Sequence, residues 1–347
     1  MKLKSVTRRV FCVGVAAIGS LTAVGAKAAT PVRVGYIPVL GSSALFVIDG
    51  LGWAKEAGLE LELVRFTSGP QAIQALVSGR IDAYVAGVLP LLQARAHGVD
   101  VKVVATGAIE ELSLVVRGPL AAGLDAGKPG GLSHDALAAR FTDFQKTVGR
   151  KPKIAAQPQG SVPDTLLRYW LKEREGVDVS AVDIVGLDID GAQQALLAGA
   201  VDGAVLREPA LTVVRARRSD VRTLATGHDL MPDQPGSVLA VLKPDAPERK
   251  AWAKALTGLF VRATSLLAEH PEQATPYVTK ALGGGLLPPA VIEGALKASA
   301  PTFVADPARI MASVSSLQNF EVSQGLLTAP QPVDALFDLQ TWRGGAQ

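Results

Sequence analysis

Residues 71–90 read QAIQALVSGRIDAYVAGVLP, and residues 191–210 repeat the pattern as GAQQALLAGAVDGAVLREPA. In each copy, an apolar helical segment ends at a glycine and leads into a short apolar strand that begins with an aspartate. The identical residues are Ala72, Gln74, Ala75, Leu76, Gly79 and Asp82 in the first copy and Ala192, Gln194, Ala195, Leu196, Gly199 and Asp202 in the second. Solenoid repeats have periods of about 20–50 residues, so this longer spacing predicts two related α/β lobes instead.

The sequences before the two copies support the duplication. Residues 32–69 and 152–190 both read as a strand, a Gly-Ser loop, a helix, a glycine turn and a second strand. In the first of them the expected helix covers residues 44–57. Strands that alternate with helices indicate a mainly parallel sheet with right-handed crossovers. In such a sheet, ligands bind beyond the carboxyl ends of the strands.

Two chain crossings are expected between the lobes. A strand over 112–117 passes into the second lobe, and a strand over 238–242 returns to the first. The chain after it is helical, and only one copy of the repeat carries such a tail. We therefore predict a discontinuous lobe I, built from 29–108 and 236–347, and a lobe II that covers 109–235.

The first 28 residues have the pattern of an export signal. Thr7-Arg8-Arg9-Val10-Phe11 is a twin-arginine motif, an apolar run follows it, and Ala26-Lys27-Ala28 has the small residues of a cleavage site. A membrane anchor is the alternative, but this run is short and diluted by Gly, Ser and Thr. We predict a signal peptide of the twin-arginine type over residues 1–28, cleaved near Ala28.

Composition then excludes several classes of function for the mature chain. The signal holds five basic residues and no acid, so its removal turns the formal charge from +3 into −2, and no basic surface for nucleic acid is expected. The one cysteine, Cys12, also lies in the signal, so the mature chain has no thiol chemistry. The four histidines have no second ligand at metal spacing, and neither a G-x-S-x-G elbow nor a catalytic carboxylate pair is present. We expect neither an enzyme, a metal nor a cofactor.

Residues 35–90 resemble the first lobe of the nitrate/sulfonate/taurine group of periplasmic substrate-binding proteins. The runs GSVPDTLLRYWL (160–171) and ALLAGAVDGAVLREP (195–209), with the helical tail, resemble its second lobe and C-terminus. The resemblance implies the two-lobed periplasmic binding protein fold of type II, with a ligand cleft between two α/β lobes. It also implies a periplasmic, monomeric receptor that captures a small anionic or zwitterionic organic solute and delivers it to the permease of an ABC importer.

The expected ligand contacts lie on the two rims of the cleft. Helix N-termini with serine caps can bind an anion through their free N–H groups, and an arginine can clamp one with its planar fork. The alternative is that the serines only cap helices and that Arg207 and Glu208 form a surface pair. Which of these two charged side chains faces the cleft is left open. The candidate residues are Tyr36, Ser42, Ser43, Ser68, Gly69, Gly87, Gly160, Ser161, Arg207 and Glu208.

The resemblance does not name the ligand. Members of the group often carry a histidine in the first loop and a tryptophan before the Glu-Pro pair, where this chain has Ser42, Ser43 and Arg207. Two other functions stay open. One is a ligand-sensing protein that serves a membrane receptor. The other is an enzyme similar to the thiamine-pyrimidine synthases of the same fold, but those depend on a cysteine-rich segment.

Overall fold

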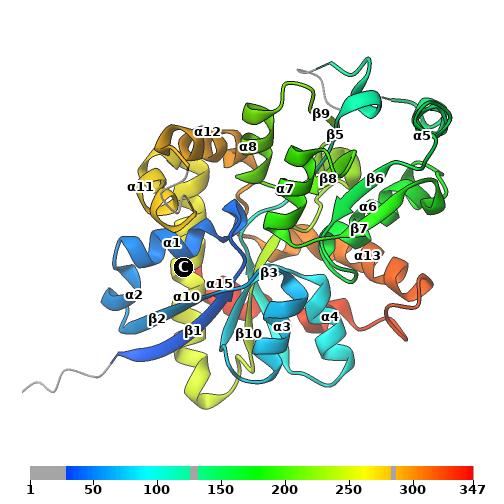
Figure 1. Ribbon diagram of the computed structural model, residues 1–347. Coiled ribbons are helices and arrows are strands. Elements are labelled where there is room, and N and C mark those ends of the chain that lie inside the picture. Colours follow the sequence, from blue (N-terminus) through cyan, green and yellow to red (C-terminus); the bar gives the residue numbers. More distant parts are fainter. Residues whose placement is uncertain (1–28, 126–131, 283–286, 347) are drawn as a thin grey trace, which may run out of the picture.

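The computed structural model describes residues 29–125, 132–282 and 287–346, and Figure 1 shows two lobes joined near the middle of the molecule. Each lobe contains one five-stranded sheet flanked by helices. The predicted signal peptide, residues 1–28, lies outside the described residues. Among the residues that are described, no helix is long and apolar enough to cross a membrane.

The first sheet joins N-terminal strands to one strand from much later in the chain. Its order is β2-β1-β3-β10-β4. Strands β2 and β3 pair in parallel with β1, whereas β10 is antiparallel to both β3 and β4. The strands are β1 Thr30–Tyr36, β2 Leu59–Arg65, β3 Ala83–Gly87, β4 Val101–Thr106 and β10 Ser237–Leu242.

The second sheet has the same arrangement, in the order β7-β6-β8-β5-β9. Strands β7 and β8 pair in parallel with β6, and β5 is antiparallel to β8 and β9. In both sheets the reversed strand directly follows a chain crossing, β5 into the second lobe and β10 back into the first. The strands are β5 Ser113–Val116, β6 Lys153–Ala156, β7 Asp183–Gly186, β8 Gly203–Leu206 and β9 Arg222–Ala225. The prediction of two related, mainly parallel α/β lobes is confirmed.

The repeated aspartates hold equivalent strands. Asp82 accepts hydrogen bonds from the backbone N–H of Arg33 at 3.1 Å and from the Arg33 guanidinium. Asp202 accepts from the backbone N–H of Lys153 at 2.8 Å and from the Arg150 guanidinium. Both carboxylates lie at the amino ends of the strands, away from the edge where a ligand is expected. Their contacts agree with the structural role expected for them.

One predicted helix of the first lobe is broken. The segment expected as a single helix over residues 44–57 forms α1 (Ser43–Gly50) and α2 (Trp53–Glu56). Gly52 between them has a φ of 73°, a left-handed conformation that interrupts the α-helical hydrogen bonds. The other helices of the lobes are α3 Gly69–Val77, α4 Leu89–Ala96, α5 His134–Val148, α6 Val162–Tyr169, α7 Ile189–Ala198, α8 Ala210–Arg217 and α9 Gly227–Leu230.

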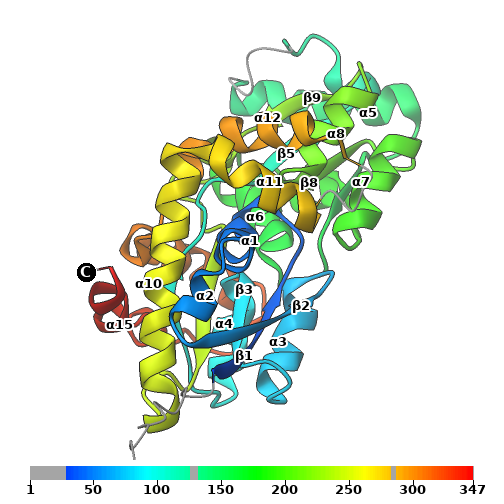
Figure 2. The ribbon, with the colours of Figure 1, turned by 90° about the vertical axis from the view of Figure 1, so that its left-hand side faces the viewer.

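The helical tail covers the first lobe and also reaches the second. Helix α10 packs on α1, and α15 packs on α10 and β4 (Figure 2). Helix α12 contacts α8, and α13 packs on both α4 and α6. The tail helices are α10 Pro247–Glu269, α11 Pro271–Leu282, α12 Pro289–Ser299, α13 Met311–Ser323, α14 Val333–Leu336 and α15 Leu339–Gly345. Lobe boundaries at 108 and 236 stay a prediction, because α12 and α13 contact elements of both lobes.

A continuous apolar core crosses the boundary between the lobes. Leu92 of α4, Leu166 of α6 and Leu317 of α13 are fully buried members of the same cluster. Burying apolar surface stabilises by roughly 25 cal/mol per Å², so the lobes gain free energy from lying against each other. The two lobes are therefore in direct apolar contact in this structure.

Candidate ligand-binding site

Loops that follow the strands of one lobe contact loops of the other lobe crosswise. The backbone N–H of Leu40, before α1, donates to the carbonyl of Glu208, before α8, at 3.1 Å. At the second contact, a Cβ added to Gly87, before α4, would lie 2.8 Å from Cγ2 of Val162 at the start of α6. The Gly-Ser loop of each lobe thus contacts the bend after the third strand of the other lobe. The expected contact residues lie at or near this junction.

A buried ion pair lies where the two chain crossings meet the second lobe. Nη1 of Arg207 lies 2.6 Å from Oε1 of Glu111, and that oxygen also accepts from Ser237 Oγ at 2.9 Å. The two charged side chains are only 4% and 7% exposed. A Cβ on Gly41 would lie 2.4 Å from both Glu111 Oε2 and Ser237 Oγ, so the first Gly-Ser loop closes directly on this cluster.

Arg207 carries an unsatisfied hydrogen-bond donor at this junction. Its Nε is buried and has no hydrogen-bond partner among the described residues. A buried, unsatisfied donor is costly, and a ligand oxygen could satisfy it. Because Glu111 balances the charge of Arg207, the pair together offers an acceptor and a donor at one place. That combination suits a ligand that carries both kinds of group.

Glu208 points to its own helix instead. Its Oε2 accepts from the backbone N–H of Thr212 at 2.9 Å, and its Oε1 lies 3.9 Å from Nη1 of the half-exposed Arg215. Burial raises the pKa of the Glu208 carboxyl, although the hydrogen bond from Thr212 opposes the shift. Of the two neighbours, Arg207 therefore reaches the interlobe cluster, and Glu208 stabilises the start of α8. The expectation that they form a surface pair with each other is wrong, since both are buried and each has other partners.

The four candidate serines have different partners. Ser68 caps α3 and Ser161 caps α6, each by accepting from the backbone N–H three residues later at 3.4 Å. Ser42 does not cap α1; its hydroxyl donates to the carbonyl of Ile37 at 2.8 Å. Ser43 is fully buried, and its Oγ has no partner among the described residues. The donor of the Ser42 hydroxyl is therefore used within the first lobe, whereas that of Ser43 has no partner among the described residues.

Aromatic side chains support the rim of the first lobe. Tyr36 is half-buried and packs edge-on against Phe46 at a centroid distance of 5.2 Å. Tyr84, which is fully buried, donates its hydroxyl to the carbonyl of Gly87 at 2.8 Å. A Cβ on Gly69 would lie 3.0 Å from that hydroxyl, so the small residue lets α3 approach the bend. Tyr84 thus fixes the Gly87 bend, and Tyr36 lies against α1.

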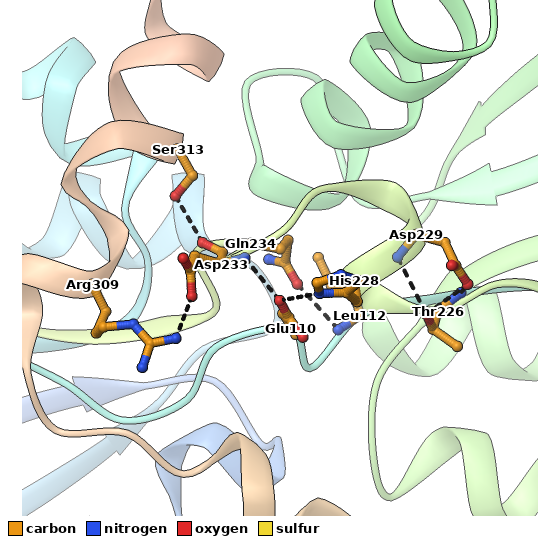
Figure 3. A network of polar contacts seen from close by, with 9 residues as sticks. All are labelled: Glu110, Leu112, Thr226, His228, Asp229, Asp233, Gln234, Arg309 and Ser313. Carbon is orange, nitrogen blue, oxygen red and sulfur yellow. Dashed lines mark hydrogen bonds and ion pairs between the residues drawn. The ribbon is translucent and has the colours of Figure 1, made fainter.

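The two crossing segments are tied together beside this junction (Figure 3). Oε1 of Glu110 accepts from the backbone N–H of Asp233 at 2.8 Å and lies 2.9 Å from Nδ1 of His228. Glu110 and Asp233 both have a φ of 50°, which is uncommon outside glycine and stores backbone strain. The tail holds the same segment, because Arg309 pairs with Asp233 at 2.5 Å. These contacts tie the two crossing segments to each other and to the tail, and we predict that the lobes hinge there.

A model of the NMT1-like family matches residues 25–282. The chain belongs to the NMT1-like family. The match covers most of the chain, including both copies of the repeat and both crossings. It confirms the family that the first-lobe and second-lobe motifs indicated.

Other proteins resemble this NMT1-like chain over most of its length. A protein of Escherichia coli described as aliphatic sulfonates-binding is 26% identical over 259 residues, which are 75% of this chain and 72% of that protein. The nitrate-binding protein NrtA of Synechocystis PCC 6803 superposes with a TM-score of 0.75 at 16% identity, over 92% of this chain and 88% of that one. A zinc-bound ligand-binding component of an ABC-type import system from Staphylococcus aureus gives 0.70 at 19%, over 90% and 98%. The predicted two-lobed periplasmic binding protein fold is confirmed.

The histidines of this NMT1-like protein pair with acids one at a time. His134, His228 and His270 lie near Glu175, Glu110 and Glu272, respectively. Within the described ranges, no three His, Cys, Asp or Glu side chains gather as a metal site would require. The described residues therefore do not provide the ligands of a tetrahedral zinc site.

Sequence reasoning missed Glu111, Ser237 and Tyr84. Glu111 and Ser237 stand directly at the ends of the two crossing strands, and this position was the available signal. Tyr84 is the one aromatic residue inside the repeated strand, where the second copy has Ala204.

Proposed function

We propose that this protein is a periplasmic receptor that captures a small organic solute between its lobes and delivers it to an ABC importer. The observation that carries the proposal is the buried Arg207–Glu111 pair at the junction of two duplicated lobes. Binding proteins need a closed, dry site with a few polar groups that fix the ligand. The names of the matched proteins, which include an importer's ligand-binding component, support the same role.

The solute is a small zwitterion or anion with an oxygen-rich head, of the sulfonate, nitrate or taurine kind. Arg207 Nε and Ser43 Oγ are buried, have no partner in the described part of the chain, and can donate to the head. Glu111 lies 2.6 Å from the same guanidinium and accepts from an ammonium or hydroxyl group. A zwitterion uses both partners of the pair, whereas a simple anion must compete with Glu111 for Arg207.

Binding and closure are coupled. A ligand that touches both lobes favours the closed form, because only there does it gain both sets of contacts. The proposed contacts are Tyr36, Ser42, Ser43, Ser68, Gly69 and Gly87 on the first lobe and Gly160, Ser161, Arg207 and Glu208 on the second. Within this set, Ser43, Ser161 and Arg207 donate hydrogen bonds to the ligand, and the others shape the rims.

The test is a thermal-shift screen with nitrate, taurine, alkanesulfonates and pyrimidines, followed by calorimetry. A ligand that binds only the native state raises the midpoint. Ser161→Ala should weaken the binding of a hit by about 1 kcal/mol, and Arg207→Ala by about 2 kcal/mol or more. Arg217→Ala, which removes an exposed charge from the end of α8, the helix that follows Arg207, is the matched control. If no compound shifts the midpoint, or Arg207→Ala binds as the parent does, the proposal is wrong.

Export follows the twin-arginine route in this proposal, and the mature protein acts as a monomer in the periplasm. Changing both Arg8 and Arg9 to Lys should leave the precursor in the cytoplasm, because that route requires the pair. Fractionation of cells that express both forms measures this. Unchanged export of the variant would assign the protein to the general secretory route.

A further inference from the structure

Helix α13 lies against both lobes at once. It packs on α4 of the first lobe and on α6 of the second. At its first turn, Ser313 Oγ donates to the carbonyl of Asp233 in the hinge at 2.7 Å. Near its end, Phe320 packs edge-on against Tyr169 of α6 at 5.7 Å. The helix therefore connects the hinge to the element that carries the Ser161 rim.

Glu321 occupies the contact between these helices. It is fully buried, and its Oε1 accepts from Thr165 Oγ1 of α6 at 2.9 Å. Its Oε2 has no hydrogen-bond partner of normal geometry among the described residues. On the other side lies Gln93 of α4, whose Nε2 would be 2.7 Å from a Cβ on Gly160. Glu321 is thus enclosed by parts of both lobes, next to the loop that leads into the Ser161 rim.

An ionised carboxylate fits this place poorly. The hydrogen-bond donors beside it, Thr165 and Gln93, are both neutral. A buried carboxylate held only by neutral donors is costly, whereas a neutral acid is tolerated. Burial raises the pKa of the Glu321 carboxyl to about 7, the Thr165 hydrogen bond opposes this, and the nearby Asp164 adds to it. If opening separates α6 from α13, Glu321 meets water and its carboxyl returns to its ordinary acidity.

We propose that Glu321 is a positioning residue that holds α6 and its Ser161 rim in the closed arrangement, and that it does so as a neutral acid. This inference rests on the proposed function, in which the lobes close on a ligand, but its test needs no ligand. Closing takes up a proton between the ordinary pKa of 4.5 and the closed-state pKa of about 7. Closure is therefore favoured below pH 4.5 and progressively loses this contribution as the pH rises to about 7.

Other charged groups near α13 need to be separated from Glu321. The elements packed against it carry Asp164 and Arg168 on α6, Arg95 on α4, Asp334 on α14 and Arg309 in the turn Pro307–Ile310. Asp164 is paired with Arg168 at 3.0 Å. In the crossing segments, the hydrogen bond to Glu110 raises the pKa of His228, which makes it a second titratable group. The His228→Asn variant controls for this second group.

The experiment measures lobe opening without any ligand. Spin labels at Glu62→Cys on β2 and Lys172→Cys beyond α6, in the full chain with Cys12→Ser, report the interlobe distance at pH 5.5 and 8.5. Both sites are exposed. The parent should show a longer-distance population at pH 8.5 that is at least several-fold larger than at pH 5.5. Glu321→Gln, an isosteric neutral side chain that still accepts from Thr165, should stay short at both values.

The variants decide the outcome. His228→Asn should keep the parent's pH response, and Glu321→Ala should be open at both values. The proposal is overturned if the parent distance does not change with pH, or if Glu321→Gln responds as the parent does. Should Glu321→Ala fail to fold, Glu321→Gln still gives the answer. A failed ligand screen with a positive labelling result would reject the proposed function and leave this inference standing.

Discussion

The two lobes share a sheet order and a repeated aspartate, but they differ at the bend after the third strand. In the first lobe this bend holds Gly87, which leaves room for Val162 of the other lobe. In the second lobe the equivalent position is Arg207, which pairs with Glu111. Both lobes therefore share the same sheet order, whereas only the second lobe has a charged residue at this bend. The first lobe provides shape at the junction, and the second provides charge.

The partner of that charge belongs to neither repeat. Glu111 and Ser237 lie in the segments that cross between the lobes, and both bond within the Arg207 cluster. The polar centre thus forms only when both lobes and both crossings are in place. Four predictions test this division of roles.

Arg207→Ala should have the largest effect on stability. It leaves Glu111 buried without a cation, and breaking such a pair costs about 3–5 kcal/mol. Urea unfolding measures the loss, with Arg217→Ala as the control. The double change Arg207→Met with Glu111→Gln should restore most of it, because no unpaired charge is left. A loss below about 1 kcal/mol for the single variant would contradict the comparison.

Gly87→Ala should come next. Its Cβ would lie 2.8 Å from Val162, and overpacking of this kind costs typically about 1–3 kcal/mol. The cost falls on the closed form, so scattering should show a larger particle. Gly294→Ala, where an added Cβ meets nothing within 4 Å, is the control. An unchanged particle size would mean that the bend is not a contact between the lobes in solution.

Asp82→Asn and Asp202→Asn should have similar effects, about 1–3 kcal/mol each, because both leave strand-start donors and an arginine without their carboxylate. Burial raises the pKa of Asp82, but the hydrogen bonds from Arg33 outweigh it and hold the pKa below its ordinary value. Its contribution to folding is therefore present above its ordinary pKa of 3.8 and is lost as the pH falls through the lowered value. Thermal unfolding of both variants between pH 2 and 7 measures this. A large effect of only one variant would break the equivalence of the lobes.

The Arg65–Asp190 pair should matter least. It joins the end of β2 to the start of α7 at 3.0 Å, but both side chains are more than half exposed. Such pairs contribute about 0–1 kcal/mol and are screened by salt. A double-mutant cycle with Asp190→Ala and Arg65→Ala, at low and high salt, measures the coupling. Coupling of several kcal/mol would make this pair, rather than the buried cluster, the main polar link.

The amino-acid sequence alone determined the duplicated α/β lobes, the two crossings and the helical tail. These follow from local patterns such as the apolar periodicity around Gly79 and Gly199, which needs no distant partner to be recognised. It also pointed to Arg207 and the serine loops, but it could not say that Arg207 pairs with Glu111 while Glu208 accepts from the backbone of α8.

Only the tertiary structure decided which side chains meet. Arg207 and Glu111 are 96 positions apart, and Thr165 and Glu321 are 156 apart, so no local pattern links them. Their contacts depend on how the lobes close on each other and where α13 lies. The sequence shows that residue 321 is a glutamate but not whether its carboxyl is buried. Its burial between α4, α6 and α13 decides whether it is an ordinary surface charge or a neutral acid that holds two lobes together.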